Sequence, residues 1–532
     1  MAGFPYRWSR PCALLTHVGT RTLGFVLPWR GKVGCMTTTV RESIRGETAP
    51  RRYEELGMQF IAGRWREGSG KPTLENRDPW TGELLFESRS ANAADVDEAY
   101  RAAKAAQPAW AARPYPERSA VLLRAAQILV ERKAEIVEWI VRESGGTQIK
   151  AGLEWQLVHG GILEAASYPG RIFGQILPSA TPGMESRVYR EPVGVVGIIS
   201  PWNFPFQLAN RSIAPALACG NGIVVKPASD TPATGATLLA KIYEEAGVPA
   251  GLFNVVIGAG SEIGDAIVEH PIPRVISFTG STPVGAHIGE LCGKHVKRTC
   301  LELGGNAPFV VLADADIDRA VAAAVTGKFM HQGQICMAIN RILVDRSIYQ
   351  TFLERFTQKV RSLKVGDRNA PDTAIGPIIN RHQLDSILEK VVKLKAAGAR
   401  TVLEGKTQGL VLDPIVLADV RNADAQEELF GPVALLIPFD GDEEGLALAN
   451  DVTYGLSSAV FGRDIDRATQ FARRIEAGMT HVNDITVNDE PNTAFGGEKA
   501  SGIGRFGGTW AIEEFTTDHW ISVQHAQRSY PF

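Results

Sequence analysis

The sequence predicts an α/β protein with two doubly wound parallel-sheet domains. Its length of 532 residues exceeds what one small core needs and favours two to four domains. From residue 193 onward, short apolar runs alternate with helical segments, which is typical of a parallel sheet covered by helices. A second series of the same kind starts at Pro308, after Gly305. The two series therefore predict two such domains.

Helices are expected before the first sheet. Asn92 is expected to cap a helix whose start holds Asp95, Asp97 and Glu98, since carboxylates suit the positive end of a helix. A second helix is expected over residues 117–143, where apolar residues recur at helical spacing. Gly145 and Gly146 would end it.

Apolar runs mark the strands, and helical spacing marks the segments between them. The expected strands are 193–199, 223–225, 253–257, 275–278, 308–312 and 340–344. The expected helices are 232–246, 261–269, 316–330 and 347–363.

Composition narrows the classes of function. The formal net charge of -3 gives no reason to expect nucleic acid or an anionic membrane as a partner. The sequence contains no stretch of about 20 apolar residues, so no membrane span is expected. The six cysteines are irregularly spaced, which fits free thiols in a reducing compartment, and no Cys/His spacing predicts a metal site.

The N-terminal segment differs from the rest of the chain. Residues 1–35 contain five basic residues and no acidic one. One interpretation is an organelle transit peptide and a mitochondrial location, although three prolines interrupt any amphipathic helix. The other is that translation starts at Met36 and the protein is cytoplasmic; we favour this one. In either case we expect residues 1–55 to form a poorly ordered extension.

Three short strings offer the groups needed for covalent attack on a carbonyl. Cys336 ends Gly-Gln-Ile-Cys, Glu302 opens Glu-Leu-Gly-Gly-Asn, and Asn203 lies in Ser-Pro-Trp-Asn-Phe-Pro. A thiolate can add to a carbonyl, an amide can hold the resulting oxyanion, and a carboxylate can activate water. A single cysteine is more often a buried hydrophobe, as we expect of Cys219, Cys292 and Cys300. Cys336 differs because it lies in a glycine-containing turn before an expected strand.

These strings, in this order and at these separations, resemble those of the aldehyde dehydrogenase superfamily. The resemblance extends from about residue 58 to the C-terminus. It implies an NAD(P)-binding domain of residues 56–170 and 193–304 and a catalytic domain of residues 305–498. It also implies a small β oligomerisation domain of residues 171–192 and 499–532. There a hairpin would pair with a C-terminal strand within 520–523 and extend a partner subunit's sheet, giving a homodimer or homotetramer.

The resemblance also implies the order of events. The Cys336 thiolate adds to the aldehyde carbon, and the Asn203 side chain and the Cys336 backbone N–H hold the oxyanion. Hydride transfer to nicotinamide leaves a thioester, which a water activated by Glu302 hydrolyses to the acid. Relatives that pass the acyl group to coenzyme A generally lack this glutamate, so Glu302 favours hydrolysis.

A turn after the strand 275–278 is the first part of the expected cofactor site. The glycine that opens it permits a tight bend, the two hydroxyls can hydrogen-bond phosphate, and the proline suits the first turn of a helix. That helix N-terminus would face the pyrophosphate of a dinucleotide. The residues are Gly280, Ser281, Thr282, Pro283, Val284 and Gly285.

Five further residues complete the expected cofactor site. The resemblance places Lys226 on the adenosine ribose, Glu428 on the nicotinamide ribose, and Trp202 and Phe430 beside the nicotinamide half. Many NAD-preferring relatives carry an acidic residue three positions after the lysine, where this chain has Ser229. A carboxylate there would repel a 2′-phosphate, so serine predicts that NADP is tolerated besides NAD. The alternative is that Ser229 only fills space.

The helix after Asn203 is expected to line the aldehyde pocket. Phe204, Gln207 and Arg211 share one face at helical spacing, and Met337 follows the nucleophile. Arg211 has two interpretations. It anchors a carboxylate of the substrate, as in semialdehyde dehydrogenases, or it pairs with an acid across the domain interface.

The substrate class rests on strings that resemble the benzaldehyde, salicylaldehyde and vanillin dehydrogenase branch, among them residues 336–341, 488–492 and 517–524. Phe204 and Met337 would give a flat, polarizable pocket suited to a ring. We therefore expect NAD(P)-dependent oxidation of an aromatic aldehyde to its acid.

Two alternatives remain open at this point. One is a succinic-semialdehyde-type dehydrogenase that uses Arg211 as carboxylate anchor. The other is a catalytically silent binding protein on the same fold, which the intact Asn203, Glu302 and Cys336 disfavour.

Overall fold

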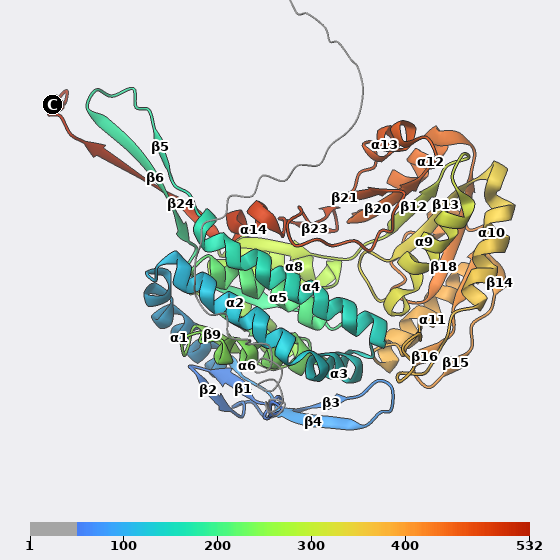
Figure 1. Ribbon diagram of the computed structural model, residues 1–532, viewed down its shortest axis with the longest axis horizontal. Helices are drawn as coiled ribbons and strands as arrows, with labels where there is room; N and C mark the ends of the chain where they lie inside the picture. The colour runs from blue at the N-terminus through green and yellow to red at the C-terminus, as the bar shows by residue number, and fades with distance from the viewer. Residues whose placement is uncertain (1–50) are drawn as a thin grey trace, which may run out of the picture. The chain divides into compact units, whose positions relative to one another are not determined.

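The computed structural model of the protein describes residues 51–532. The predictions for residues 1–35, and for most of the expected 1–55 extension, lie outside the described residues. Within the described range, no helix has the length and apolar character needed to cross a membrane. The three largest sheets are drawn in Figure 1.

The first sheet has eight strands. In spatial order they are β2 (Arg64–Arg66), β1 (Gln59–Ile61), β9 (Phe253–Val255), β8 (Gly222–Lys226), β7 (Val195–Ile199), β10 (Val275–Thr279), β11 (Arg298–Glu302) and β23 (Gly502–Ile503). The five central strands are parallel, and Val196 lies opposite Ile223 on one side and Val275 on the other. The strands expected between residues 193 and 278 are confirmed.

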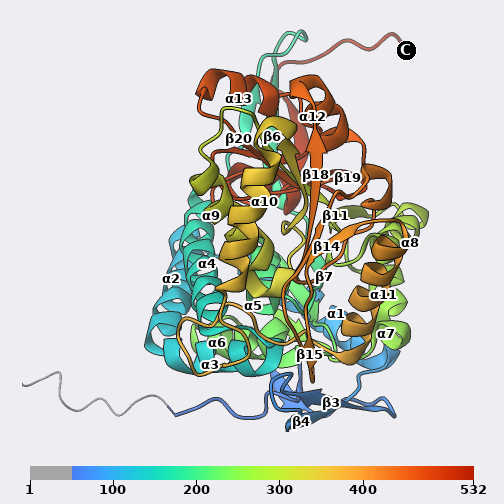
Figure 2. The same cartoon turned by 90° about the vertical axis from the view of Figure 1, so that its right-hand side faces the viewer.

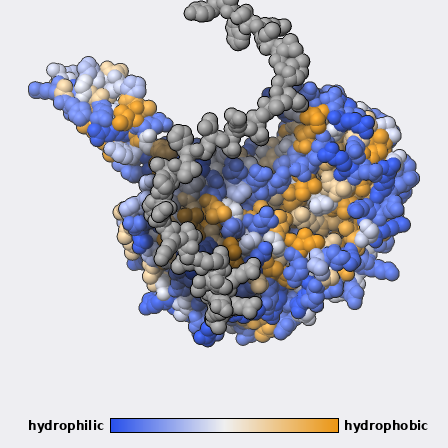
Figure 3. Space-filling view, viewed as in Figure 1, coloured by the Kyte–Doolittle hydropathy of each residue, from blue (hydrophilic) through white to orange (hydrophobic). Residues whose placement is uncertain are grey.

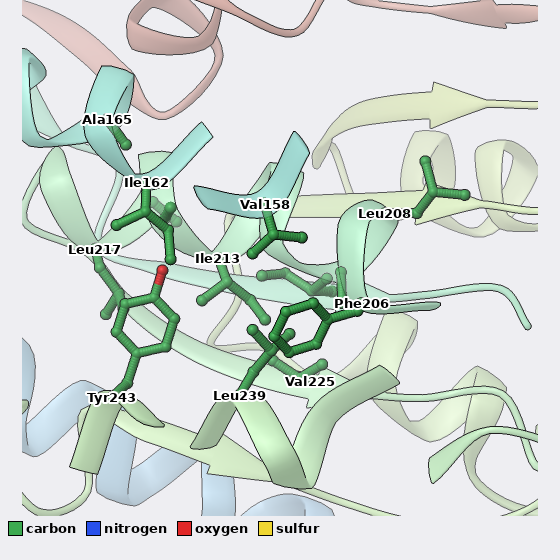
Figure 4. Close-up of a cluster of buried hydrophobic side chains, with 14 of the residues drawn as sticks. Val158, Ile162, Ala165, Phe206, Leu208, Ile213, Leu217, Val225, Leu239 and Tyr243 are labelled. Atoms are coloured by element: carbon green, nitrogen blue, oxygen red, sulfur yellow. The ribbon is translucent and has the colours of Figure 1, made fainter. Parts of the chain in front are cut away.

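Helices cover both faces of this sheet. They are α1 (Ala93–Ala111), α2 (Tyr115–Glu131), α3 (Lys133–Ser144), α4 (Gln148–Ser167), α5 (Pro205–Ala218), α6 (Leu238–Glu245), α7 (Gly260–Glu269) and α8 (Thr282–Lys294). Side chains alternate along each strand, so Val196 packs with α2, α4, α5 and α6, whereas Val195 packs with α1, α7 and α8. Figure 4 shows Phe206 and Ile213 of α5 between Val158 of α4 and Leu239 of α6. The helix that carries the expected substrate residues is thus fixed in a core.

Two expected helices differ from the prediction. The cap of α1 is confirmed, because Asn92 and Asp95 form a reciprocal capping box. The single helix expected over 117–143 is wrong: α2 and α3 are separate and meet at Arg132, which has φ -107 and ψ 15. The Arg132 guanidinium pairs with Glu135 and Glu245, and these ion pairs hold the joint.

The helix expected over 232–246 begins with a wider π-turn, Ala233–Thr237, before α6. The buried carboxylate of Glu143 accepts hydrogen bonds from the backbone N–H groups of Ala233 (2.8 Å) and Thr234 (2.6 Å). Glu143 therefore caps the start of this segment from a neighbouring helix.

The second sheet has seven strands. In spatial order they are β14 (Arg400–Leu403), β17 (Ile415–Ala418), β18 (Val433–Phe439), β13 (Ile339–Asp345), β12 (Ala307–Val311), β20 (Ser457–Phe461) and β21 (Met479–Val482), of which only β14 is antiparallel. Its helices are α9 (Ile317–Phe329), α10 (Arg346–Arg361), α11 (Arg381–Ala396), α12 (Gly441–Asn450) and α13 (Ile465–Ala472). Figure 2 shows β18 between α10 and α11. The α/β fold with two doubly wound sheets is confirmed.

The third sheet forms an arm. It contains β24 (Thr516–Gln524), β6 (Met184–Pro192) and β5 (Gln175–Leu177), with Trp520 opposite Val188. The expected pairing of the hairpin with the C-terminal strand is confirmed. The arm projects from the body in Figure 1 and carries a hydrophobic patch in Figure 3. Residues 499–515 lie elsewhere, because β23 joins the first sheet.

The remaining elements are short. They are β3 (Thr73–Arg77), β4 (Leu84–Arg89), β15 (Thr407–Gln408), β16 (Val411–Leu412), β19 (Tyr454–Gly455), β22 (Glu498–Lys499), α14 (Gly508–Glu514) and the 3-10 turns Tyr168–Arg171, Met330–Gly333 and Asn422–Asp424.

Candidate active site

Cys336 lies in the turn between α9 and β13, as expected from the sequence. The chain approaches it through three consecutive residues in the left-handed region: His331 (φ 48), Gln332 (φ 56) and Gly333 (φ 73). A Cβ on Gly333 would lie 2.3 Å from the carbonyl oxygen of Gly431, so the turn is closely packed. Two non-glycine residues in this conformation store strain, which the surrounding structure has to balance.

Two cavities meet at Cys336. Three residues line both of them: Asn203, Leu208 and Cys336. The first cavity, of about 140 Å³, is also lined by all four expected substrate residues: Phe204, Gln207, Arg211 and Met337. The second, of about 230 Å³, is also lined by five expected cofactor residues: Trp202, Gly280, Ser281, Glu428 and Phe430. A thiol between two cavities can react with a molecule in one while a second molecule occupies the other.

Asn203 is held against the cysteine turn. Its side chain is buried, and its Nδ2 donates to the carbonyl oxygen of Gln334 at 2.9 Å. An amide group has two N–H bonds, so one remains for an oxygen bound near Cys336. Gln334 is fixed in turn, because its side-chain oxygen accepts from the N–H of Ile379 at 3.0 Å.

Glu302, at the end of β11, is the least satisfied carboxylate of the site. It is 1% exposed, and neither of its oxygens has a hydrogen-bond partner within residues 51–532. Burial raises its pKa to about 8, although the charges of Arg211 and Arg505 act in the opposite direction. Burial, reinforced by the charge of Glu302, raises the pKa of the Cys336 thiol to about 12. A base near neutral pKa therefore lies within electrostatic range of the thiol.

Arg211 pairs with Asp489, as in the second of its two interpretations. The guanidinium forms an ion pair with Asp489 and lies over the ring of Phe495 at 3.7 Å. Gln207 Nε2 donates to the same carboxylate oxygen at 3.2 Å. Both charged side chains are mostly buried, at 7% and 10% exposed. The positive charge of Arg211 is thus balanced within the protein.

The second cavity has polar and aromatic walls. Glu428 accepts a hydrogen bond from the N–H of Gly305 at 3.0 Å, and burial raises the pKa of its carboxyl to about 7. Phe430 has φ 52 and meets Trp202 edge to face, with ring centroids 5.4 Å apart. A Cβ on Gly304 would lie 2.9 Å from the Glu428 carboxylate, so a larger residue there would displace this side chain.

The Gly280–Gly285 turn opens α8 as expected, with Pro283 in the first turn. Ser281 makes no side-chain cap hydrogen bond, so its hydroxyl and the helix N-terminus remain available to an anion. Thr282 differs from the expectation, because its hydroxyl already bonds Ala500 O and Gly304 N, each at 3.2 Å. Val284 is 48% exposed, and Gly285 packs against Leu303.

Lys226 and Ser229 lie farther along the same edge, at and after the end of β8. Lys226 is 5% exposed, its Nζ donates to Pro227 O at 3.1 Å, and burial lowers its pKa to about 8. Ser229 is partly exposed. A helix N-terminus, a carboxylate and an aromatic wall fit a dinucleotide. Among residues 51–532, no group of three or more His, Cys, Asp or Glu residues could hold a metal ion.

Sequence reasoning missed several lining residues. In the first cavity they include Leu153, Leu157, Ile335 and Phe495, and in the second they include Gln383 and Lys390 of α11. Leu153 and Leu157 recur at i, i+4 on α4, a signal for a shared helix face. That signal does not say which element the face meets, so the cavity could not be inferred from it.

Comparison with known proteins agrees with this geometry. The pattern of the Aldehyde dehydrogenase family matches residues 65–521. The chain is 54% identical to a vanillin dehydrogenase of Corynebacterium glutamicum over 471 residues, which are 88% of this chain and 97% of that protein. It is 53% identical to a benzaldehyde dehydrogenase of Bacillus subtilis over 483 residues, 90% of this chain and 99% of that protein.

The fold is also that of solved relatives. The crystal structure of an NAD-dependent benzaldehyde dehydrogenase from Corynebacterium glutamicum superposes with a TM-score of 0.83 at 50% identity, over 90% of this chain and 98% of that one. The chain therefore belongs to the aldehyde dehydrogenase family and is an oxidoreductase that acts on an aldehyde group.

Proposed function

We propose that this enzyme oxidises aromatic aldehydes, such as benzaldehyde or vanillin, to carboxylic acids with NAD or NADP. The observation that carries the proposal is that Cys336 and Asn203 line both cavities. The first cavity then holds the aldehyde and the second the nicotinamide half of the cofactor. The named activities of the two relatives support the aromatic class.

The walls of the first cavity suit an aromatic ring. Phe204, Met337, Leu153 and Leu157 present apolar and polarizable surface to it. Its only charged lining residues within the described chain, Arg211 and Asp489, neutralise each other. An uncharged ring is therefore a better occupant than a chain that ends in a carboxylate.

In the first step Glu302 takes the proton of the Cys336 thiol, and the sulfur forms a bond to the aldehyde carbon. The aldehyde oxygen becomes an oxyanion, which accepts hydrogen bonds from the free N–H of the Asn203 amide and from the Cys336 backbone. The bound dinucleotide supplies the acceptor for the hydride that leaves the aldehyde carbon. An acyl thioester remains on Cys336.

Between the two steps Glu302 releases the thiol proton to solvent, so in the second step its carboxylate is again ionised and acts on water. With both oxygens unpartnered, the carboxylate can accept a proton from a water molecule, whose oxygen then adds to the thioester carbon. The bond to sulfur breaks, the Cys336 thiolate leaves, and the carboxylic acid is released. A pKa of about 8 keeps a fraction of Glu302 ionised at neutral pH.

The proposal that NADP is used besides NAD depends on one residue, Ser229. Ser229 offers a hydroxyl and no negative charge beside the expected adenosine ribose, so we propose that NADP binds as well as NAD. The solved relative named above is NAD-dependent, which supports NAD as one of the two.

We also propose a cytoplasmic homo-oligomer. The described cysteines Cys219, Cys292, Cys300 and Cys336 are free thiols, which suits a reducing compartment. The arm exposes Ile176 (74%) and Trp520 (63%), and its strands offer a sheet edge. Exposed apolar groups beside an open edge suit pairing with a second copy of the chain.

The test crosses NAD and NADP with benzaldehyde, vanillin, hexanal and succinic semialdehyde, and follows absorbance of the reduced nicotinamide. The proposal predicts the highest kcat/KM for the two aromatic aldehydes. Best turnover of succinic semialdehyde, lost in Arg211→Ala, would replace it by the semialdehyde alternative. Cofactor binding without turnover of any aldehyde would instead favour a silent binding protein.

A further inference from the structure

A buried polar cluster lies under the start of α5, outside both cavities. Lys150 and Glu154 of α4 are 1% and 0% exposed and form an ion pair one helical turn apart. The ammonium also donates to the hydroxyl of Ser144 at 3.1 Å. Buried charges are costly unless they are paired and hydrogen-bonded, and here each charge has such partners.

Glu154 bonds the first turn of the neighbouring helix. The residue at the N-cap of α5 is Phe204, whose side chain offers no acceptor, and no side-chain cap hydrogen bond forms there. Glu154 Oε1 instead accepts from the backbone N–H groups of Phe206 (2.8 Å) and Gln207 (3.1 Å). A carboxylate from another helix thus fills the position that a capping side chain usually takes and meets the positive end of α5.

The same cluster confines Phe204. The ammonium of Lys150 lies 4.5 Å from the centre of the Phe204 ring. His331 meets that ring edge to face, with centroids 5.4 Å apart and an angle of 87°. Burial holds the pKa of His331 well below its ordinary value, and the charge of Lys150 acts in the same direction, so the imidazole is neutral. Phe204 is thereby fixed between α4 and the cysteine turn.

Asn203 comes directly before Phe204 and shares its constraints. Its amide reaches Gln334 from a short segment between β7 and α5. At its far end, that segment is anchored where Glu154 binds the first turn of α5 and where Phe204 is confined. A shift of the helix start would therefore move the Asn203 amide relative to Cys336.

We propose that Glu154, with its charge balanced by Lys150, is a positioning residue that sets the Asn203 amide for oxyanion stabilisation. The inference rests on the proposed function, since it concerns how the carbonyl addition on Cys336 is assisted. Glu154 touches neither substrate nor cofactor and acts through Asn203. Its loss then lowers kcat more than it raises KM for the aldehyde.

The test is a double-mutant cycle on kcat with benzaldehyde and NAD, using Glu154→Gln, Asn203→Ala and the two combined. In the native background, Glu154→Gln is expected to lower kcat about tenfold. This loss is smaller than the loss of about 10²–10³-fold expected of Asn203→Ala, which removes the oxyanion donor itself. In the Asn203→Ala background it should change kcat less than twofold, because the group it positions is gone.

Glu143→Gln is the matched control. Glu143 is also fully buried and also caps a neighbouring helix start through two backbone N–H groups, but its side-chain hydrogen bonds within residues 51–532 go to Ala233 and Thr234 and not to the cysteine turn. Its effect on kcat should be the same with or without Asn203. If Glu154→Gln leaves Lys150 unpaired and the fold is lost, Lys150→Met with Glu154→Leu removes the cap without an unpaired charge.

Equal loss of kcat from the Glu154 change in both backgrounds, while the native enzyme oxidises benzaldehyde, would overturn the positioning role alone. Absence of aldehyde turnover in the native enzyme would overturn the proposed function and this inference together. The positioning role would be supported if the Glu143 and Glu154 variants lowered the melting temperature equally, while only the effect of Glu154→Gln on kcat depended on the presence of Asn203.

Discussion

The two cavities that meet at Cys336 are built in different ways. The cofactor-side cavity takes much of its wall from contiguous strings that follow parallel strands, such as Gly280–Ser281 after β10, together with Glu428 and Phe430, which precede β18. The substrate-side cavity takes its wall from α4, α5, the cysteine turn and the 487–495 loop. A cofactor shared by many enzymes is bound by local turns, whereas the substrate is selected by side chains that only the tertiary fold brings together.

The cavities also differ in their charges. On the substrate side, the charges of Arg211 and Asp489 balance each other in an ion pair, whereas Arg211 Nη1 has no hydrogen-bond partner among residues 51–532. On the cofactor side, Glu428 accepts a backbone hydrogen bond and Lys390 donates to a backbone carbonyl, and neither forms an ion pair within the described residues 51–532. The substrate side is thus prepared for a neutral ligand and the cofactor side for a polar one.

The largest effect on activity is expected from a change at Cys336, which lines both cavities. Cys336→Ala should lower kcat by about 10⁴-fold or more with every aldehyde, because no bond to the substrate can form. Binding of NAD should persist, because the second cavity keeps its other walls. Steady-state absorbance and cofactor titration by fluorescence measure the two properties. Turnover that survives the change would show that Cys336 is not the nucleophile.

Glu302→Gln should lower steady-state turnover by about 10²–10⁴-fold, since hydrolysis loses its base. In the native enzyme kcat should rise with pH through about 8, where the Glu302 carboxyl loses its proton. The variant should lose this rise. A pH profile of kcat from 6 to 10 tests it, and an unchanged profile in the variant would assign the rise to another group.

The raised pKa of Glu302 also predicts how the stability of the protein depends on pH. Burial raises its pKa from 4.5 to about 8, so the folded state holds the proton more tightly than the unfolded chain. The free energy of unfolding should therefore fall as pH rises between about 4.5 and 8. Glu302→Gln should flatten this fall, measured by urea unfolding at several pH values. A variant that loses stability as steeply as the native protein would mean that Glu302 is ionised in the fold.

Removing one of the two charges on the substrate side should lower the free energy of unfolding more than it changes substrate specificity. Arg211→Met leaves the buried Asp489 unpaired and should cost about 3–5 kcal/mol of unfolding free energy. Arg211→Met with Asp489→Leu should recover much of that loss, because neither charge remains. In the recovered double variant the ratio of kcat/KM for benzaldehyde to that for succinic semialdehyde should be nearly unchanged. A collapse of semialdehyde turnover alone would make Arg211 a substrate anchor.

The smallest effect is expected at the edge of the cofactor site. Ser229→Glu should raise KM for NADP about tenfold or more, because a carboxylate there would repel the 2′-phosphate. KM for NAD should change little, which makes NAD the internal control. Equal KM changes for both cofactors would mean that Ser229 does not face the ribose.

Sequence patterns predicted elements that depend on residues close together in the chain. The capping box at Asn92 and the helix opened by Pro283 follow from turn chemistry, and spacing predicted six strands of the two sheets: β7, β8, β9, β10, β12 and β13. The other strands of these sheets were not predicted. The break at Arg132 could not be predicted, because it depends on ion pairs with residues of which one, Glu245, lies more than 100 positions away. Asp489 was missed as the partner of Arg211 for the same reason. Contacts between distant segments leave no periodic signal.

One measurement tests the central claim most directly: mass spectrometry of Glu302→Gln after it has reacted once with benzaldehyde and NAD. The account predicts a benzoyl group on the peptide that contains Cys336, and one reduced nicotinamide formed per subunit. Release of benzoate at the native rate, with no acyl group on Cys336, would contradict a cysteine thioester that Glu302 hydrolyses.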